Sequence, residues 1–216
     1  MYLKWINCRV SQADRPAFSA AQQAWRALGE LDGFHGQFGG WSLDKPELAC
    51  ILGIWKHMAS HKRFMSDTHD SITSKSGQDD LYETSVIEFM DLLFEIPGAS
   101  GSPIHTLGSS ILLRVVISHV HSNRQAHFVQ MQKEIRNPGL TKLDGFMGGL
   151  FGRSDSDSDR FIAIMGWRDQ SSHEHDEQNA LVDLRDESSE EKDLRSRDVF
   201  RVALDPKWYV PSKTEA

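Results

Sequence analysis

Two stretches of this chain share one sequence pattern: LDGFHGQFGGWS at residues 31–42 and LDGFMGGLFGRS at residues 143–154. The same separation of 112 residues relates three further pairs of identical residues: Trp55 and Trp167, Ser60 and Ser172, and His61 and His173. Over this region ten of thirty-one positions are identical, which is too ordered for chance. Solenoid repeats have periods of roughly 20–50 residues, so a period near half the chain length indicates a duplicated domain.

The composition excludes several classes of protein. The chain has 216 residues and is 39% hydrophobic, which is enough for the cores of two domains. Its net charge of −7 and its lack of basic clusters argue against a nucleic-acid partner. It has no signal-peptide pattern and no apolar run of about 18 residues, so we expect no membrane partner and a cytoplasmic location. Cys8 and Cys50 lie in apolar runs without a CxxC spacing and are interpreted as buried thiols without a metal.

The first half of the sequence alternates strand-like and helix-like segments. Runs of aromatic and β-branched residues predict strands, and apolar positions at helical spacing predict helices. The expected order is a strand over residues 2–10, a helix over 14–28, strands over 33–41 and 48–55, a helix over 56–69, a loop over 71–80 and a strand over 82–94.

The second half repeats this order after residues 95–110, whose Gly, Ser and Pro content predicts a linker. The expected elements are a strand over 112–121, a helix over 124–136, strands over 145–152 and 160–167, a helix over 170–185 and a strand over 199–210. Pro206 should shorten the pairing of the last strand, because proline cannot donate a backbone hydrogen bond.

The order β-α-β-β-α-β is that of a ferredoxin-like domain, whose antiparallel sheet carries both helices on one face. The fold class is therefore α+β, with a first repeat over residues 1–94, a linker over 95–110 and a second repeat over 111–210. The sheet face opposite the helices is apolar in each repeat and must be buried. We expect the repeats to pack sheet to sheet as an intramolecular dimeric α+β barrel.

These motifs resemble those of the antibiotic-biosynthesis-monooxygenase superfamily of dimeric α+β barrels. The resemblance rests on the two LDGF strands, the tryptophan that ends the following strand and the Ser-His pair in the next helix. More narrowly, the chain resembles the uncharacterised YdbC-like two-repeat proteins of bacteria. That likeness covers nearly the whole chain and rests on KWINC at 4–8, GQFGGW at 36–41, ACILGIW at 49–55 and the FM and HD pairs within 64–70.

The resemblance implies three alternative functions. The first is a monooxygenase that acts on a small apolar or aromatic substrate in a pocket of the first repeat. The second is a haem-binding or haem-degrading protein in which a histidine of the second helix is the axial ligand, so haem is the cofactor of that alternative alone. The third is a non-enzymatic module that binds a small ligand. The superfamily does not decide whether this chain is an enzyme, and its oligomeric state is left open between a monomeric pseudo-dimer and a homodimer.

The haem-degrading branch of the superfamily implies one set of site residues. Its members carry an Asn on the first strand, and Asn7 stands at that position here. Phe64 replaces the Trp of the second helix, and Ser74 replaces the His, although His69 lies five residues earlier. Asn7 and His69 are the predicted catalytic residues. The alternative for Asn7 is a structural hydrogen bond to a neighbouring loop or strand end.

A stripe of four side chains follows the same helix at four-residue spacing: His57, His61, Met65 and His69. Residues at this spacing share a helical face and could present imidazoles to a ligand or a metal. In the second repeat the equivalent residues are Asp169, His173, Glu177 and Leu181, a change that favours a solvated face. His61 and Met65 are predicted ligand-binding residues, and no metal site is predicted. The recurrence of Ser-His favours a capping or packing role for His61.

Aromatic residues distinguish the first repeat from the second. Trp5, Trp25 and Phe64 are predicted to bind a flat apolar ligand, although ordinary core variation is an alternative explanation. The second repeat has Val115, Ile135 and Asp176 at these positions, and Ile117 at that of Asn7. Because ligand pockets are mostly apolar with a few polar groups, we expect the pocket in the first repeat, between its sheet and its helices.

Overall fold

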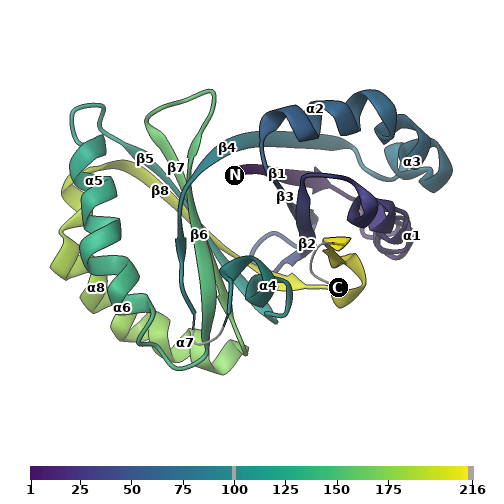
Figure 1. Ribbon diagram of the computed structural model, residues 1–216. Helices are drawn as coiled ribbons and strands as arrows, with labels where there is room; N and C mark the ends of the chain where they lie inside the picture. Colours follow the sequence, from purple (N-terminus) through teal and green to yellow (C-terminus); the bar gives the residue numbers. More distant parts are fainter. Residues whose placement is uncertain (99–100, 214–216) are drawn as a thin grey trace. The chain divides into compact units, whose positions relative to one another are not determined.

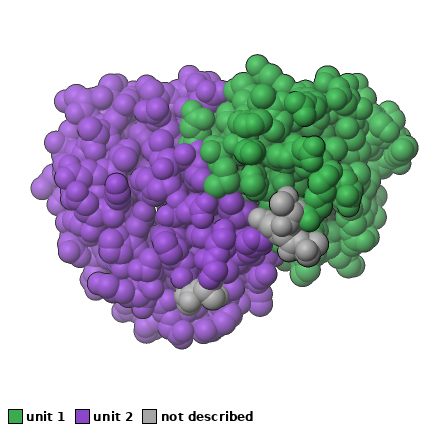
Figure 2. All heavy atoms as spheres, viewed as in Figure 1, with its two compact units in different colours: residues 1–91, 202–216 green, residues 92–201 purple. Residues whose placement is uncertain are grey.

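The computed structural model describes residues 1–98 and 101–213. The chain forms a mixed α+β fold with two compact units. Unit 1 comprises Met1–Asp91 and Val202–Ala216, and unit 2 comprises Leu92–Arg201 (Figure 2). The C-terminal segment that the sequence assigned to the second repeat therefore lies in unit 1. In the part of the chain that the structure describes, no helix is both long and apolar enough to span a membrane.

Unit 1 is built on an antiparallel sheet. Its elements are β1 (Tyr2–Arg9), α1 (Arg15–Ala21), the 3₁₀-helix η1 (Gln22–Glu30), β2 (Phe34–Ser42), β3 (Leu48–Trp55), α2 (Met58–Asp67), α3 (His69–Ser76), η2 (Gln78–Leu81), the start of β4 (Thr84–Ile96), η5 (Pro206–Trp208) and β9 (Val210–Pro211) (Figure 1). β1 lies between β3 and β4, and β2 lies on the other side of β3. β9 and the last residues of β8 pair with the free edge of β2.

Unit 2 has the same strand order. It contains the end of β4, α4 (Pro103–Gly108), β5 (Leu112–Val120), α5 (Gln125–Met131), the π-helix η3 (Gln132–Arg136), α6 (Asn137–Leu140), β6 (Phe146–Ser154), β7 (Arg160–Trp167), α7 (Gln170–Gln178), α8 (Ala180–Ser188), η4 (Glu190–Lys192) and most of β8 (Leu194–Leu204). β5 lies between β7 and β8, and β6 lies on the other side of β7, where the end of β4 joins it.

The strand registers of the two units agree. Tyr2 lies opposite Trp55 in unit 1, and Leu112 lies opposite Trp167 in unit 2. Each unit also has a register shift one residue after the Phe of its LDGF motif, between Phe34 and Gly36 and between Phe146 and Gly148. Both units therefore have a β-bulge at the same place in the LDGF strand.

The repeated glycine of LDGF makes a turn against the start of a helix. Gly33 has a φ of 80°, and a Cβ at this position would collide with the side chain of Ser60. Gly145 has a φ of 88° and meets Ser172 in the same way. Only glycine adopts this conformation without strain and leaves room for the serine. The identical Gly and Ser residues of the two sequence motifs therefore have a structural explanation.

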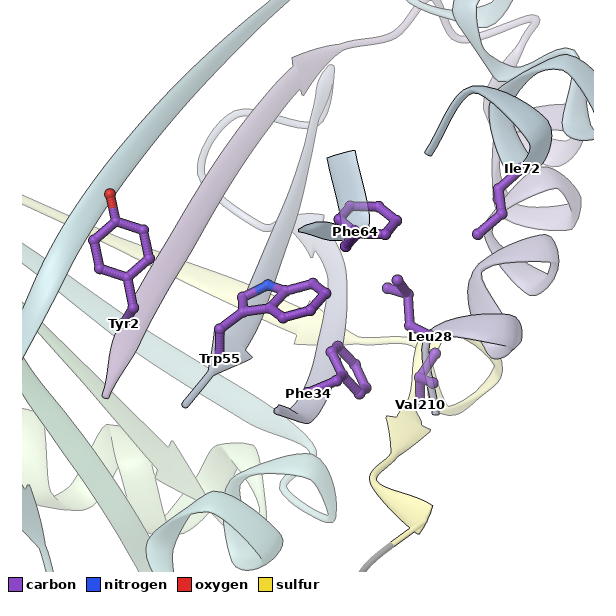
Figure 3. Packing of buried hydrophobic residues seen from close by; sticks show 7 residues of the cluster. All are labelled: Tyr2, Leu28, Phe34, Trp55, Phe64, Ile72 and Val210. Atoms are coloured by element: carbon purple, nitrogen blue, oxygen red, sulfur yellow. The ribbon is translucent and has the colours of Figure 1, made fainter. Parts of the chain in front are cut away.

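Each unit has a hydrophobic core against its helices. In unit 1 the core contains Tyr2, Leu28, Phe34, Trp55, Phe64, Ile72 and Val210 (Figure 3). In unit 2 it contains Ile96, Leu112, Leu140, Phe146, Met165, Trp167 and Leu181. Trp55 and Trp167, the recurring tryptophans of the two motifs, are 2% and 0% exposed, so each anchors the core of its unit.

Three predicted segments differ from the structure. Residues 71–80 were expected to be a loop but form the end of α3 and η2, because Ile72 packs into the core and Gly77 ends the helix with a φ of 62°. The predicted linker contains α4, which buries Ile104 and Leu107. β8 begins at Leu194 rather than at residue 199, since its backbone pairs with β5 although its side chains are charged.

Candidate functional site

A lysine lies inside unit 1. Side chains alternate between the two faces of a strand, and on β1 the residues Lys4, Ile6 and Cys8 share the face that the helices cover. There they line a cavity of about 50 Å³ between the sheet and the helices. Lys4 is only 9% exposed, which is unusual for a lysine and removes most of its side chain from water.

Aromatic rings form one side of this cavity, which we call the Lys4 cavity. Trp25 comes from η1, Trp55 from β3 and Phe64 from α2. The Phe64 ring is stacked on Trp55 with 5.2 Å between ring centroids, and it meets Trp25 edge-on at 6.3 Å. Figure 3 shows Phe64 and Trp55 in the core beside Leu28, which also lines the cavity. A flat apolar group would find complementary surfaces here.

Three glutamines supply the uncharged polar groups of the cavity: Gln22, Gln37 and Gln78. Gln78 accepts a hydrogen bond from the indole Nε1 of Trp25 and so fixes that ring. Gln22 is 1% exposed, and its Nε2 has no hydrogen-bond partner among the described residues. A buried donor without a partner costs free energy, so a ligand oxygen at Gln22 would be stabilised.

The electrostatic environment of Lys4 is set by burial. Desolvation lowers the pKa of Lys4 from 10.5 to about 8, and the nearby Cys8 opposes this shift. Burial also raises the pKa of the Cys8 thiol to about 12, so Cys8 stays neutral near pH 7. The described residues that line the cavity include no carboxylate, and Lys4 forms no ion pair with any of them. Within the described part of the chain, Lys4 is therefore a buried cation without a paired anion.

The structure brings together two of the predicted aromatic residues and separates them from the others. Trp25 and Phe64 line the Lys4 cavity. Trp5 and Asn7 alternate with Lys4 along β1 and so point to the opposite face of the sheet. Trp5 is 2% exposed, and the Oδ1 atom of Asn7 is buried and has no hydrogen-bond partner among residues 1–98 and 101–213.

The helical stripe of unit 1 divides into separate structural roles. His57 caps α2, since its Nδ1 accepts a hydrogen bond from the backbone N–H of Ser60. His61 is 5% exposed, and its ring lies edge-on to Trp55 and Phe89 at 5.4 and 5.0 Å. Burial lowers the pKa of His61 to about 4. His61 is therefore a neutral core residue near pH 7.

His69 and Met65 lie outside the cavity wall. The His69 ring packs against Trp25 at 5.7 Å and Phe64 at 5.6 Å, and its Nδ1 lies 3.0 Å from a carboxylate oxygen of Asp70. Met65 is 37% exposed and so faces solvent. His69 thus supports the two aromatic rings from behind rather than reaching the cavity.

The contacts of His57 and His61 do not fit an axial ligand of haem. The aromatic rings that enclose His61 leave no space beside it for a macrocycle, and His57 uses Nδ1 as a helix cap. The Lys4 cavity is also far smaller than haem. Among the described residues, no group of three His, Cys, Asp or Glu side chains could hold a metal ion.

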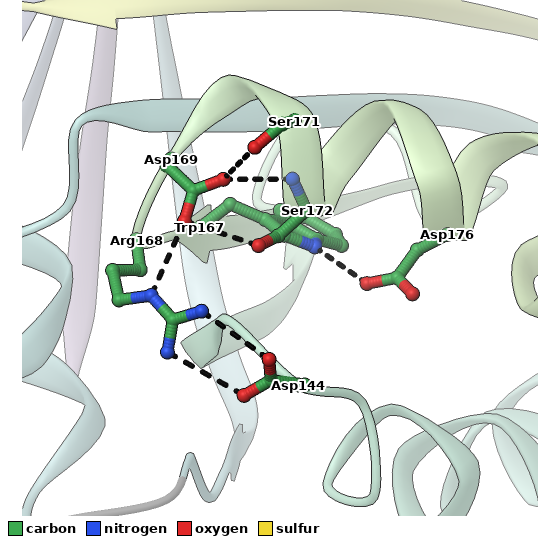
Figure 4. Close-up of polar contacts among 7 residues, drawn as sticks. All are labelled: Asp144, Trp167, Arg168, Asp169, Ser171, Ser172 and Asp176. Atoms are coloured by element: carbon green, nitrogen blue, oxygen red, sulfur yellow. Dashed lines mark hydrogen bonds and ion pairs between the residues drawn. The ribbon is translucent and has the colours of Figure 1, made fainter.

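Unit 2 differs at the equivalent positions. Arg114 stands on β5 where Lys4 stands on β1, opposite Met165 in place of Gly53. Asp176 replaces Phe64 and accepts a hydrogen bond of 3.1 Å from the indole of Trp167 (Figure 4). A carboxylate therefore takes the place of the ring that stacks on Trp55 in unit 1.

Sequence reasoning missed Lys4, Gln22 and Gln78. The available signal was a lysine in the middle of a strand whose neighbours on both faces are apolar, YLKWINC at residues 2–8. A lysine at such a position indicates either a strand at the edge of a sheet or a buried charge. In the structure β1 lies between two other strands, so the charge is buried. Gln78 lies in the segment that was expected to be a loop.

Several solved structures have the same fold as this chain. The chain superposes on a protein provisionally named a monooxygenase from Lactobacillus acidophilus NCFM with a TM-score of 0.76 and 10% identity, over 97% of this chain and 95% of the other. A protein provisionally named a chlorite dismutase gives a TM-score of 0.62 and 11% identity, over 96% and 95% of the two chains. The chain therefore shares its α+β fold with proteins provisionally named monooxygenases and chlorite dismutases, in agreement with the fold that the sequence motifs predicted.

The family follows from sequence. Residues 2–90 match the model of a domain of unknown function, DUF4937. The uncharacterized protein YdbC of Bacillus subtilis (strain 168) is 38% identical over 80 residues, which are 36% of this chain and 67% of that protein. The chain belongs to the family of YdbC. The matched domain ends at residue 90, so it contains every residue that lines the Lys4 cavity.

Proposed function

We propose that unit 1 binds a small aromatic molecule with an acidic oxygen, such as a phenol, in the Lys4 cavity and oxidises it with dioxygen. The observation that carries this proposal is the buried Lys4 cation without an anionic partner, beside three aromatic rings. A phenolate would supply the missing negative charge, and its ring would match the apolar wall. Fold neighbours provisionally named monooxygenases support the reaction class.

Lys4 has a defined role in this reaction. Near pH 7 it is still mainly protonated because its pKa is about 8, so it attracts a phenolate and lowers the pKa of the bound phenol. Deprotonation raises the electron density of the ring toward dioxygen. Burial strengthens this electrostatic effect, because a charge among buried side chains is screened less than a charge in water. Gln22 offers a second hydrogen-bond donor to the same oxygen.

The electrons of the reaction come from the substrate. A phenol with an unsubstituted ring position reacts with one dioxygen: one oxygen atom forms a carbonyl at that position, and the other leaves as water with the two hydrogen atoms that the phenol loses. The product is a quinone. Dioxygen accepts four electrons and the phenol loses four, so no separate reductant is needed.

Binding must enlarge the Lys4 cavity. Its volume of about 50 Å³ holds a few water molecules, whereas a cavity that binds benzene measures roughly 150 Å³. The movable wall is η1, a 3₁₀-helix of nine residues that carries Gln22 and Trp25. Such helices are uncommon beyond about four residues and often mark a functional hinge. Breaking the hydrogen bond from Trp25 to Gln78 would free this wall.

The proposed site lies in one of two related units. We infer that the two units are tandem ferredoxin-like repeats, since their strand orders and registers agree. One repeat keeps the aromatic cavity while the other replaces Phe64 by Asp176. The expected asymmetry of the site rests on this difference.

Oxygen consumption tests the proposed reaction. We expect the full chain to take up oxygen in the presence of 1-naphthol and to form a naphthoquinone. Lys4→Met should lower kcat/KM at least about tenfold, because it removes a charged hydrogen bond. Lys62→Met, which changes an exposed lysine of α2, is the matched control. If 1-naphthol binds without oxygen uptake, unit 1 is a binding module and the oxidation is refuted.

A further inference from the structure

Unit 2 contains a second cavity with a different chemistry. Arginine side chains dominate its wall: Arg114, Arg136, Arg185 and Arg197 line a space of about 80 Å³ together with Glu177 and Glu190. The arginines outnumber the carboxylates by two to one. We propose that this cavity, the arginine cavity, binds a small oxyanion such as phosphate or a carboxylate.

The two glutamates of the cavity already have partners. Glu190 is 4% exposed, and its Oε1 accepts a hydrogen bond of 2.9 Å from Arg197. Its Oε2 accepts one of 3.2 Å from Gln132. Glu177 pairs with Arg114. Each glutamate therefore already pairs with an arginine of the cavity, Glu177 with Arg114 and Glu190 with Arg197.

Two guanidinium groups keep unused donors inside the protein. The Arg136 side chain is 9% exposed, and its Nη1 lies 3.5 Å from Glu190 without forming a hydrogen bond. The Nε of Arg114 is also buried without a hydrogen-bond partner in the described chain. Arg185 forms no ion pair with any described residue. Burying charged donors without partners is costly, and an oxyanion in the cavity would satisfy them.

The size and geometry of the arginine cavity suit a small anion. One water molecule needs about 10–15 Å³ of such space, so 80 Å³ accommodates about six water-sized groups, close to the five heavy atoms of phosphate. Guanidinium groups present paired N–H donors that match phosphate and carboxylate oxygens. The arginines come from β5, η3, α8 and β8, so the fold itself converges them on this space.

Calorimetry and thermal unfolding of the full chain test this site. We expect inorganic phosphate or succinate to raise the Tm above that in sodium chloride at equal ionic strength, with saturable heat of binding. A response to phosphate alone assigns a phosphate group, and a response to succinate alone assigns a carboxylate. Absence of binding by both anions would overturn the proposal.

Variants separate an anion site from a structural ion-pair network. Arg136→Met should weaken binding about tenfold or more, because it removes a charged donor. Arg185→Met should weaken binding as well, and it leaves the ion pairs of the fold intact. Arg26→Met, an exposed arginine of unit 1, is the control and should bind as the parent does. Equal affinity in Arg185→Met and the parent would contradict the proposal, whatever the stability of Arg136→Met.

Discussion

The burial of charged Lys4 lowers the free energy of unfolding by an amount that depends on pH. The apolar cavity lowers its pKa to about 8 from the ordinary value of 10.5, so the folded state holds the lysine proton less tightly than the unfolded chain does. Below pH 8 both states are protonated, and the folded state carries the full desolvation cost. As the pH rises from 8 to 10.5, the folded state loses its proton first and the cost is relieved.

This sign leads to a prediction for Lys4→Met. Near pH 7 the substitution should raise the free energy of unfolding by about 3 kcal/mol, the equivalent of the pKa shift. The gain should shrink as the pH increases toward 10.5. Urea unfolding of the variant and the parent between pH 7 and pH 10.5 measures the difference, with Lys62→Met as control. A gain that does not depend on pH would mean that Lys4 is not a buried cation.

The burial of His61 makes the free energy of unfolding depend on pH in the acid range. Its folded-state pKa of about 4 lies below the ordinary value of 6.5 because the ring is buried. The unfolded chain therefore binds a proton first as the pH falls, and stability is lost between pH 6.5 and pH 4. The loss should reach about 3 kcal/mol in the parent.

His61→Gln should flatten this part of the pH profile. Because the glutamine does not titrate, the free energy of unfolding of the variant should change less between pH 6.5 and pH 4, whatever its absolute value. His173, which burial also shifts to a lower pKa, continues to titrate in unit 2 and leaves a residual slope. An unchanged slope in His61→Gln would show that His61 is accessible to protons.

Helices α2 and α7 begin with different caps at equivalent positions. In unit 1 the imidazole of His57 accepts the backbone N–H of Ser60 at 3.2 Å. In unit 2 the carboxylate of Asp169 accepts a hydrogen bond from the backbone N–H of Ser172 at 2.7 Å. It also accepts hydrogen bonds from the hydroxyls of Ser171 and Ser172 (Figure 4). These hydrogen bonds hold the pKa of Asp169 well below its usual range. The carboxylate also suits the positive end of the helix dipole.

An exchange of caps tests this comparison. His57→Asp should raise the Tm by about 2–4 °C, because aspartate is a strong N-cap and carries the favourable charge. Asp169→His should lower it. Thermal unfolding near pH 7 checks both variants, and Asp169→Asn, which keeps an accepting oxygen, is the control for Asp169→His. A lower Tm for His57→Asp would mean that the imidazole has a role beyond capping.

Most strands were predictable from sequence because their apolar runs are bounded by turn residues. β3 and β7 agree residue for residue, and β1 and β2 agree within one residue at each end. The failures occurred where tertiary packing overrides local preference. The Ser- and Thr-rich segment at 71–76 looks like a loop, yet burial of Ile72 holds it in a helix. The charged start of β8 looks like a loop as well, yet its backbone pairs with β5.

The candidate site was predictable only in part. Trp25 and Phe64 were found because aromatic residues unique to one repeat stand out in a comparison of the two halves. Trp5 stands out in the same way but points to the other face of β1, and the face of a strand cannot be assigned when both faces are apolar. Lys4 escaped because a lysine is normally taken as exposed. Its burial depends on the central position of β1 in the sheet.

At the scale of the whole molecule, the chain combines two units of the same strand order with different interiors. Unit 1 encloses a lone lysine among aromatic rings, and unit 2 encloses arginines in excess over glutamates. Lys4 and Arg114 occupy equivalent positions, so each unit places one cation on its central strand under its helices. The sheet-to-sheet packing expected from the sequence stays a prediction.

The absorption spectrum of bound 4-nitrophenol tests the Lys4 cavity most directly, because the phenol and the phenolate absorb at different wavelengths. At a pH about one unit below its own pKa, free 4-nitrophenol is mainly neutral. We expect saturable binding to the parent and to Arg136→Met with growth of the phenolate band, since Lys4 stabilises the anion. Lys4→Met should lose that band. Binding without a phenolate band, or an equal band in Lys4→Met, would contradict the account.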